Sequence, residues 1–230
     1  MKVDRITSGI SGLDQYIEGG FEKNSAILIA GGGGSGKTIL GTQFLIHGIE
    51  KYNETGIYIS FEESKKKFYM HMKRFGWDLE RYENEGRFIF ITYSPRDMAD
   101  IVSTGSRSLE KSIKEVNAKR IVIDSLSAYT VLFEKESEQR EMLVSLFAMI
   151  ERWDCTTVVI AEEDQYPERH QSNVMGFMAD AIILLYTILK NNKDMIRGLQ
   201  VFKMRGTDHE YRILPLAITE KGIILKTGSI

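Results

Sequence analysis

The sequence predicts an α/β fold: a mostly parallel, twisted sheet with helices on both faces and an antiparallel β extension at the C-terminal end. Short runs rich in Ile and Val alternate with longer segments of helical periodicity, which is typical of successive βαβ units. The runs are almost continuously apolar, as strands are when both faces of the sheet are covered. After residue 180, apolar runs follow one another through short turns, which predicts hairpins added to the same sheet.

Each element has its own local signal. The Ile/Val-rich runs predict strands over residues 26–30, 56–61, 88–92, 120–124 and 156–161. Helical periodicity predicts helices over residues 37–52, 64–75, 98–116 and 137–153, with Ser64 and Ser137 as N-cap residues. The extension is expected over residues 181–189, 198–204, 211–218 and 223–226, joined by the turn-like sequences NNKD, GTDH and EKG.

Length and composition indicate one soluble domain over residues 1–230. The chain has no repeat, low-complexity tract or Pro/Ser-rich linker, and 43% apolar with 27% charged residues is an ordinary globular composition. The longest apolar run near the C-terminal third, 179–189, contains Asp180 and falls short of the ~20 residues of a membrane helix. The first residues lack the apolar stretch of a secretory signal, and a lone Cys155 forms no internal disulfide, so we expect a cytoplasmic protein.

Charge limits the possible partners. Thirty basic and 32 acidic residues give a formal net charge of −2, so no bulk positive field would hold a nucleic acid. The segment 162–173 is also acidic, and we do not expect DNA as an obligate ligand. The four histidines lie at 47, 71, 170 and 209 and, with one cysteine, form no zinc-type spacing.

A glycine-rich motif gives the strongest functional signal. GGGGSGKT satisfies G-x-x-x-x-G-K-[ST] and lies between a predicted strand and a predicted helix, where a phosphate-binding loop (P-loop) belongs. In such a loop, backbone N–H groups surround phosphate oxygens, the lysine reaches the β- and γ-phosphates, and the hydroxyl residue ligates Mg²⁺. The sequence therefore predicts an ATP and Mg²⁺ site formed by Gly31, Gly32, Gly33, Gly34, Ser35, Gly36, Lys37 and Thr38.

Acidic residues at the ends of two predicted strands can complete this site. Asp124 ends the predicted strand 120–124, which favours it as the second Mg²⁺ carboxylate (Walker B), although a strand-end Asp also caps following segments. Glu62 and Glu63 follow the strand 56–61 at the same carboxyl edge. Adjacent residues of an extended chain point to opposite sides, so only one can face the γ-phosphate, and a solvated acidic pair is the alternative.

Seven motifs in order resemble the KaiC-like branch of the RecA/RadA ATPases. They are SGISGLD (8–14), GGF (19–21), the P-loop, SFEE (60–63), VIDSLSA (122–128), TTVVIAEE (156–163) and VFKMRG (201–206) followed by DH (208–209). The resemblance covers residues 8–225 and implies a RecA-type P-loop core, with ATP at subunit interfaces of a ring or filament. It assigns the catalytic glutamate to Glu62, with Glu63 as its supporting partner.

The resemblance also implies residues that act on a neighbouring subunit. It makes Lys203 and Arg205 groups that reach the next subunit's nucleotide, and His209 an interface or nucleotide contact. Without the resemblance, a strand-end Lys-x-Arg is an ordinary solvated edge. We expect the chain to form a homo-oligomer, and specifically a hexameric ring. We expect this assembly to be an ATPase that regulates an unidentified protein partner through its nucleotide state.

The sequence departs from its relatives in two respects. Clock proteins of the KaiC type carry two such domains, whereas this chain holds one, and their phosphoacceptor Ser-Thr pair falls at Gly176 and Phe177 here. An autokinase is therefore not expected, although Ser172 or Thr207 could be modified. Two other functions stay open: a slow or non-hydrolysing ATP-binding scaffold, and a DNA recombination accessory resembling RadA paralogues.

Overall fold

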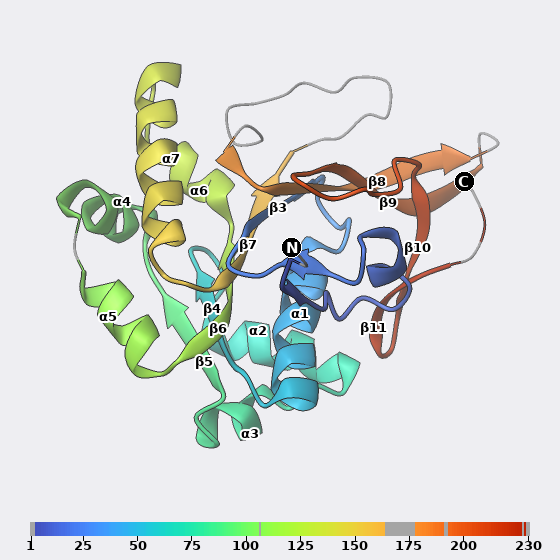
Figure 1. Ribbon diagram of the computed structural model, residues 1–230, viewed down its shortest axis with the longest axis horizontal. Helices are drawn as coiled ribbons and strands as arrows, with labels where there is room; N and C mark the ends of the chain where they lie inside the picture. The colour runs from blue at the N-terminus through green and yellow to red at the C-terminus, as the bar shows by residue number, and fades with distance from the viewer. Residues whose placement is uncertain (1–2, 106, 164–177, 191–192, 227, 229–230) are drawn as a thin grey trace.

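The computed structural model describes residues 3–105, 107–163, 178–190, 193–226 and 228. A nine-stranded sheet forms the centre of this part of the chain (Figure 1). Its strands are β3 (Ala26–Gly31), β4 (Thr55–Ser60), β5 (Phe88–Thr92), β6 (Ala118–Asp124), β7 (Thr156–Glu162), β8 (Ala181–Lys190), β9 (Asp194–Met204), β10 (Leu214–Thr219) and β11 (Gly222–Leu225). A separate small pair, β1 (Arg5–Ile6) and β2 (Phe21–Glu22), is antiparallel.

The strand order is β11-β10-β9-β8-β3-β7-β6-β4-β5. Strands β3, β4, β5, β6, β7 and β8 run parallel to one another, and β9, β10 and β11 are antiparallel additions next to β8. The predicted fold class is therefore confirmed. One detail differs, because β8 opens the C-terminal group yet pairs in parallel with β3, so the antiparallel part begins at β9.

Helices cover both faces of the sheet. Figure 1 shows α1 to α3 on one side and α4 to α7 on the other. Their bounds are α1 (Lys37–Tyr52), α2 (Lys65–Met72), α3 (Leu79–Asn84), α4 (Pro95–Thr104), α5 (Ser108–Glu115), α6 (Leu126–Thr130) and α7 (Glu136–Glu151), with short 3₁₀ turns at Asp14–Tyr16 and Lys73–Phe75. In the described residues, no helix combines the length and the apolar character that crossing a membrane requires.

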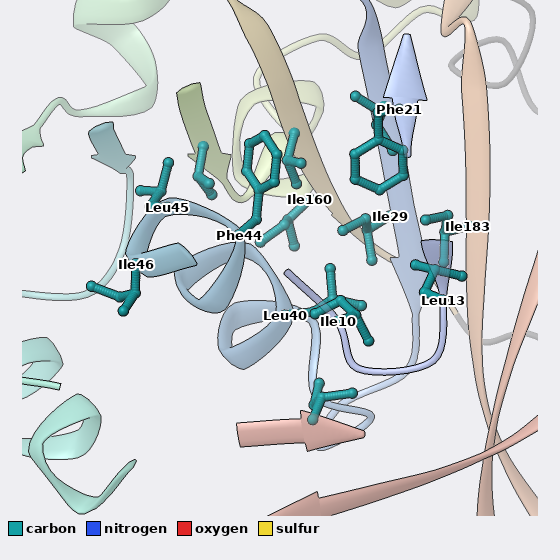
Figure 2. Packing of buried hydrophobic residues seen from close by; sticks show 14 of the residues in the cluster. Ile10, Leu13, Phe21, Ile29, Leu40, Phe44, Leu45, Ile46, Ile160 and Ile183 are labelled. Atoms are coloured by element: carbon teal, nitrogen blue, oxygen red, sulfur yellow. The ribbon is translucent and has the colours of Figure 1, made fainter. Parts of the chain in front are cut away.

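The core beside the P-loop is built around α1. Its buried side chains, including Leu40 and Phe44, share one apolar cluster with Ile29 of β3 and Ile160 of β7 (Figure 2). These contacts come from the central strands, so the apolar stripe of α1 fixes the helix over the middle of the sheet. The start of α1, and with it the P-loop, is therefore held rigidly at the carboxyl ends of β3 and its neighbours.

Several predicted boundaries were wrong. The helix expected over 98–116 is two helices, because Gly105 adopts a left-handed conformation at φ +60° and ends α4. Ser137 lies inside α7, whose N-cap position is Lys135. Ser64 does occupy the N-cap position of α2, but its side chain makes no capping hydrogen bond. The helices α3 and α6 were not predicted.

Candidate functional site

The glycine-rich loop connects β3, which ends at Gly31, to α1, which begins at Lys37. Gly34 and Gly36 adopt positive φ angles of +73° and +107°, which L side chains rarely adopt. A Cβ atom on Gly31 would lie 2.6 Å from the carbonyl oxygen of Leu185. The loop therefore needs glycine at these positions for conformational freedom and for close packing on β8.

Lys37 and Ser35 are the polar side chains of this loop whose surroundings bear on ligand binding. The Nζ atom of Lys37 donates hydrogen bonds to the carbonyl oxygens of Gly31 (2.8 Å) and Gly32 (2.9 Å). The Oγ atom of Ser35 is buried and, within the described part of the chain, has no hydrogen-bond partner. A buried hydroxyl without a partner costs free energy, and an acceptor oxygen of a bound phosphate would satisfy it.

The first residues of α1 meet the end of β6. The Thr38 hydroxyl donates a 2.8 Å hydrogen bond to Oδ2 of Asp124, and the Tyr58 hydroxyl donates one of 2.5 Å to the same oxygen. Burial raises the pKa of Asp124, while the hydrogen bonds from Tyr58 and Thr38 and the nearby Lys37 ammonium oppose that shift. Burial also raises the pKa of Tyr58 well above its usual range, so its hydroxyl is a proton donor.

The two glutamates after β4 have different surroundings. Oε2 of Glu62 lies 3.4 Å from the hydroxyl of Ser125, the residue next to Asp124. Glu63 turns away, since its Oε1 lies 2.8 Å from Nδ1 of His71 on α2 and its backbone N–H donates to the Ser60 hydroxyl. Of the pair, Glu62 is thus the one that contacts the residue next to Asp124.

Two further residues reach the P-loop that the sequence reasoning missed. Nε of Arg197, on β9, lies 3.4 Å from the carbonyl oxygen of Gly34. Glu162, at the end of β7, lies close enough that a Cβ on Gly33 would be 3.3 Å from its Oε1. The rule that favoured Asp124 and Glu62, a carboxylate after a parallel strand, would also have found Glu162. No local signal indicated Arg197, because its place depends on the pairing of β9 with β8.

Lys203 and Arg205 lie at the amino ends of the parallel strands, whereas the P-loop lies at their carboxyl ends. Lys203 pairs with Ile182 near the start of β8, and its Nζ donates 2.8 Å to the carbonyl oxygen of Ala179. Arg205 forms a 3.3 Å ion pair with Asp180, whose carboxylate accepts from the Ala26 N–H at the start of β3. Burial and the neighbouring Arg205 charge lower the pKa of Lys203.

The structure therefore does not bring Lys203 and Arg205 to the P-loop of their own chain. At about 3.3 Å per residue, the length of β3 places roughly 13 Å or more between the two edges. His209 follows in the same segment, where the backbone N–H of Glu210 donates to the carbonyl oxygen of Tyr16. The predicted residues thus divide into a P-loop group and an opposite-edge group.

The donor set at the P-loop fits ATP and Mg²⁺. Mg²⁺ keeps several waters and is usually bound through one or two carboxylates together with substrate phosphates, and Thr38 and Asp124 supply one hydroxyl and one carboxylate. Within residues 3–105, 107–163, 178–190, 193–226 and 228, no group of three His, Cys, Asp or Glu side chains forms an all-protein metal site. Residues 164–177 lie outside the described part, so the structure does not report on His170, Ser172, Gly176, Phe177 or most of the acidic segment 162–173.

Comparison with known proteins gives one consistent result. The family model "ATPase: KaiC" matches residues 6–229. The circadian clock protein KaiC3 of Synechocystis is 32% identical over 97% of this chain, but the chain spans only 46% of that protein. A UPF0273 protein of Pyrococcus horikoshii is 32% identical over 96% of this chain and 93% of its own length. The crystal structure of a KaiC-like protein from the same archaeon superposes with a TM-score of 0.86 at 32% identity, covering 98% of this chain and 100% of that one.

Proposed function

Since the chain belongs to the KaiC family of ATPases within the RecA superfamily, we propose that it binds ATP with Mg²⁺ and hydrolyses it in a head-to-tail oligomer. The observation that carries the proposal is the 2.8 Å hydrogen bond between Thr38 and Asp124, which are 86 residues apart in the chain. This contact joins the P-loop to a strand-end carboxylate in the arrangement that P-loop ATPases require.

Binding rests on the loop from Gly31 to Thr38. Its backbone N–H groups and the start of α1 favour negative charge, and the Lys37 ammonium exchanges its loop carbonyls for the β- and γ-phosphates. Thr38 and Asp124 would hold Mg²⁺, which would supply positive charge to the phosphates when bound. Ser35, whose hydroxyl has no hydrogen-bond partner among the described residues, donates to a phosphate oxygen.

Hydrolysis is assigned to Glu62. Its carboxylate accepts a hydrogen bond from a water molecule and takes the proton of that water as the oxygen bonds to the γ-phosphorus. The bond from this phosphorus to the β–γ bridging oxygen breaks, and ADP and inorganic phosphate leave. The 3.4 Å contact with Ser125 keeps the Glu62 carboxylate beside Asp124 and supports this role. Glu63, engaged with His71, is a supporting residue.

Assembly completes the site. Lys203 and Arg205 lie too far from their own P-loop to touch its nucleotide, so we assign them to the γ-phosphate of the next subunit, with His209 as a further contact there. Added positive charge on the transferring group lowers the barrier, and an arginine acting across an interface raises the rate by about 10³- to 10⁵-fold in the best-studied cases. A hexameric ring is the assembly that we expect.

The cellular role that we propose is regulation of a protein partner through the nucleotide state. Clock activity is not carried over, because the chain spans about half the length of the clock proteins that it resembles. The scaffold alternative is disfavoured by the presence of both Glu62 and Asp124. The DNA-accessory alternative is disfavoured by the net charge of −2.

Steady-state ATP hydrolysis on a size-calibrated sample tests the proposal, with Mg²⁺ or EDTA and with or without single-stranded DNA. We expect turnover that needs Mg²⁺, occurs in the oligomeric fraction and is unchanged by DNA. ATP binding without turnover would favour the scaffold. Sub-micromolar DNA binding at physiological salt, with a salt slope of several units at about 0.7 per phosphate contact, would favour the recombination accessory.

A further inference from the structure

Asp124 accepts two hydroxyl hydrogen bonds at one oxygen, and only one of the donors belongs to the P-loop. Thr38 donates from α1 and Tyr58 donates from β4, the strand next to β6. Two donors on Oδ2 fix the rotation of the carboxylate about its Cβ–Cγ bond. A ligand that must present an oxygen to a small cation with strict octahedral geometry benefits from such fixing.

The Tyr58 hydroxyl is itself held by packing. The side chain is 1% exposed, and its ring contacts Phe68 of α2 (4.3 Å between centroids) and lies parallel to Phe90 of β5 (5.6 Å). A tyrosine has only two side-chain torsions, and these neighbours leave them no room to change. The hydroxyl is therefore a fixed point against which the Asp124 carboxylate is set.

We propose that Tyr58 is a positioning residue for Mg²⁺: its hydroxyl holds Asp124 in the orientation in which this carboxylate binds the cation. The inference rests on the proposed function and adds to it a residue outside the P-loop, Walker B and glutamate motifs. Tyr58 does not touch the nucleotide. Its effect passes through Asp124 alone, so Mg²⁺ affinity should change when Tyr58 changes, while nucleotide affinity without the metal should not.

The experiment titrates Mg²⁺ against binding of a fluorescent ATP analogue to Tyr58→Phe, which keeps the ring and removes the hydroxyl. Tyr82→Phe is the matched control, because Tyr82 is equally buried in the same core and donates to a carboxylate, Glu50, away from the P-loop. Loss of an outer-shell partner typically weakens a metal site by 10- to 100-fold. We expect the Mg²⁺ concentration for half-saturation to rise about tenfold in Tyr58→Phe and to stay within twofold in Tyr82→Phe.

A double variant separates positioning from a general loss of structure. In an Asp124→Asn background, Tyr58→Phe should have no further effect on the Mg²⁺ titration, and binding of the analogue in EDTA should match the unaltered protein throughout. An unchanged Mg²⁺ requirement in Tyr58→Phe, or equal effects of Tyr58→Phe with and without Asp124, would overturn the inference and leave the proposed function standing. If the unaltered protein bound the analogue no better with Mg²⁺ than in EDTA, the proposed function itself would fail.

Discussion

Glu62 and Glu63 are adjacent in the chain, yet their carboxylates contact different elements. Glu62 meets the Ser125 hydroxyl at the end of β6, whereas Glu63 meets Nδ1 of His71 on α2. One peptide unit thus separates a side chain that contacts the residue after β6 from a side chain that contacts α2.

This difference predicts unequal effects of the same substitution. Glu62→Gln should retain ATP binding and lose turnover by about 10²- to 10⁴-fold, because the amide cannot take the proton of the attacking water. Glu63→Gln should cost less than about tenfold, since it only weakens the contact with His71. Single-turnover and equilibrium binding measurements on both variants test this, and an inactive Glu63→Gln beside an active Glu62→Gln would reverse the assignment.

Lys37→Ala should abolish measurable ATP binding, a loss of at least about 100-fold in affinity, because a full charge on two phosphates disappears. The fold should stay intact, since the two hydrogen bonds of the Lys37 ammonium described above go to loop carbonyls and not to the apolar core. Isothermal calorimetry with urea unfolding checks both statements. Lys51→Ala, an exposed lysine near the end of α1, is the matched control and should bind normally. Unchanged affinity in Lys37→Ala would remove the P-loop assignment.

Mixing two inactive variants tests action between subunits. Lys37→Ala subunits keep Lys203 and Arg205 but lack a usable site, whereas Arg205→Ala subunits keep the site but lack the arginine. A mixed oligomer should recover hydrolysis that neither variant has alone, because some interfaces then join an intact site to an intact arginine. Arg212→Ala, which removes an exposed arginine from the same segment, should be active unmixed. Mixed oligomers without activity would make Arg205 a residue of its own subunit's site or a solvated edge.

Arg120 offers a prediction about stability. Its side chain is fully buried, with Nε 2.6 Å from Glu54 and Nη1 donating to the carbonyl oxygens of Thr7 and Phe44. Arg120→Ala should lower the free energy of unfolding by about 3–5 kcal/mol, because it leaves Glu54 and buried carbonyls without their partner. Urea denaturation measures this, and a change below about 1 kcal/mol would show that water replaces the guanidinium.

The strands and the P-loop group could be predicted because their signals are local. Apolar runs predict the parallel strands, and the carboxyl-edge rule puts Asp124 and Glu62 at the same edge of the sheet as the P-loop, where Asp124 contacts Thr38 and Glu62 contacts Ser125. The break at Gly105 also had a local signal, a glycine within a Ser/Thr-rich stretch, which the helical period on both sides obscured. The six-residue α3 begins at Leu79, after the N-cap residue Asp78, whose carboxylate accepts from the Arg81 N–H, but so short a segment gives little periodicity.

What the sequence could not supply depends on pairing between distant strands. The parallel register of β8 with β3 decides that Arg197 reaches Gly34 and that Lys203 lies at the far edge. The sequence of residues 181–204 does not indicate beside which strand of the sheet these residues pair. Tyr58 was missed for the same reason. A tyrosine in a strand is ordinary, and its role depends on the pairing of β4 with β6, the strand that ends at Asp124.

The P-loop and the Lys203–Arg205 pair lie at opposite ends of β3, and this separation would limit the number of complete sites in an assembly. If each complete site needs the P-loop of one molecule and the Lys203–Arg205 pair of another, an open row of n molecules holds n − 1 working sites. Turnover per molecule would then climb with the length of the row and reach its full value only when the last molecule meets the first. Dilution would lower specific activity before any molecule unfolds, and concentration itself would act as a control on the enzyme.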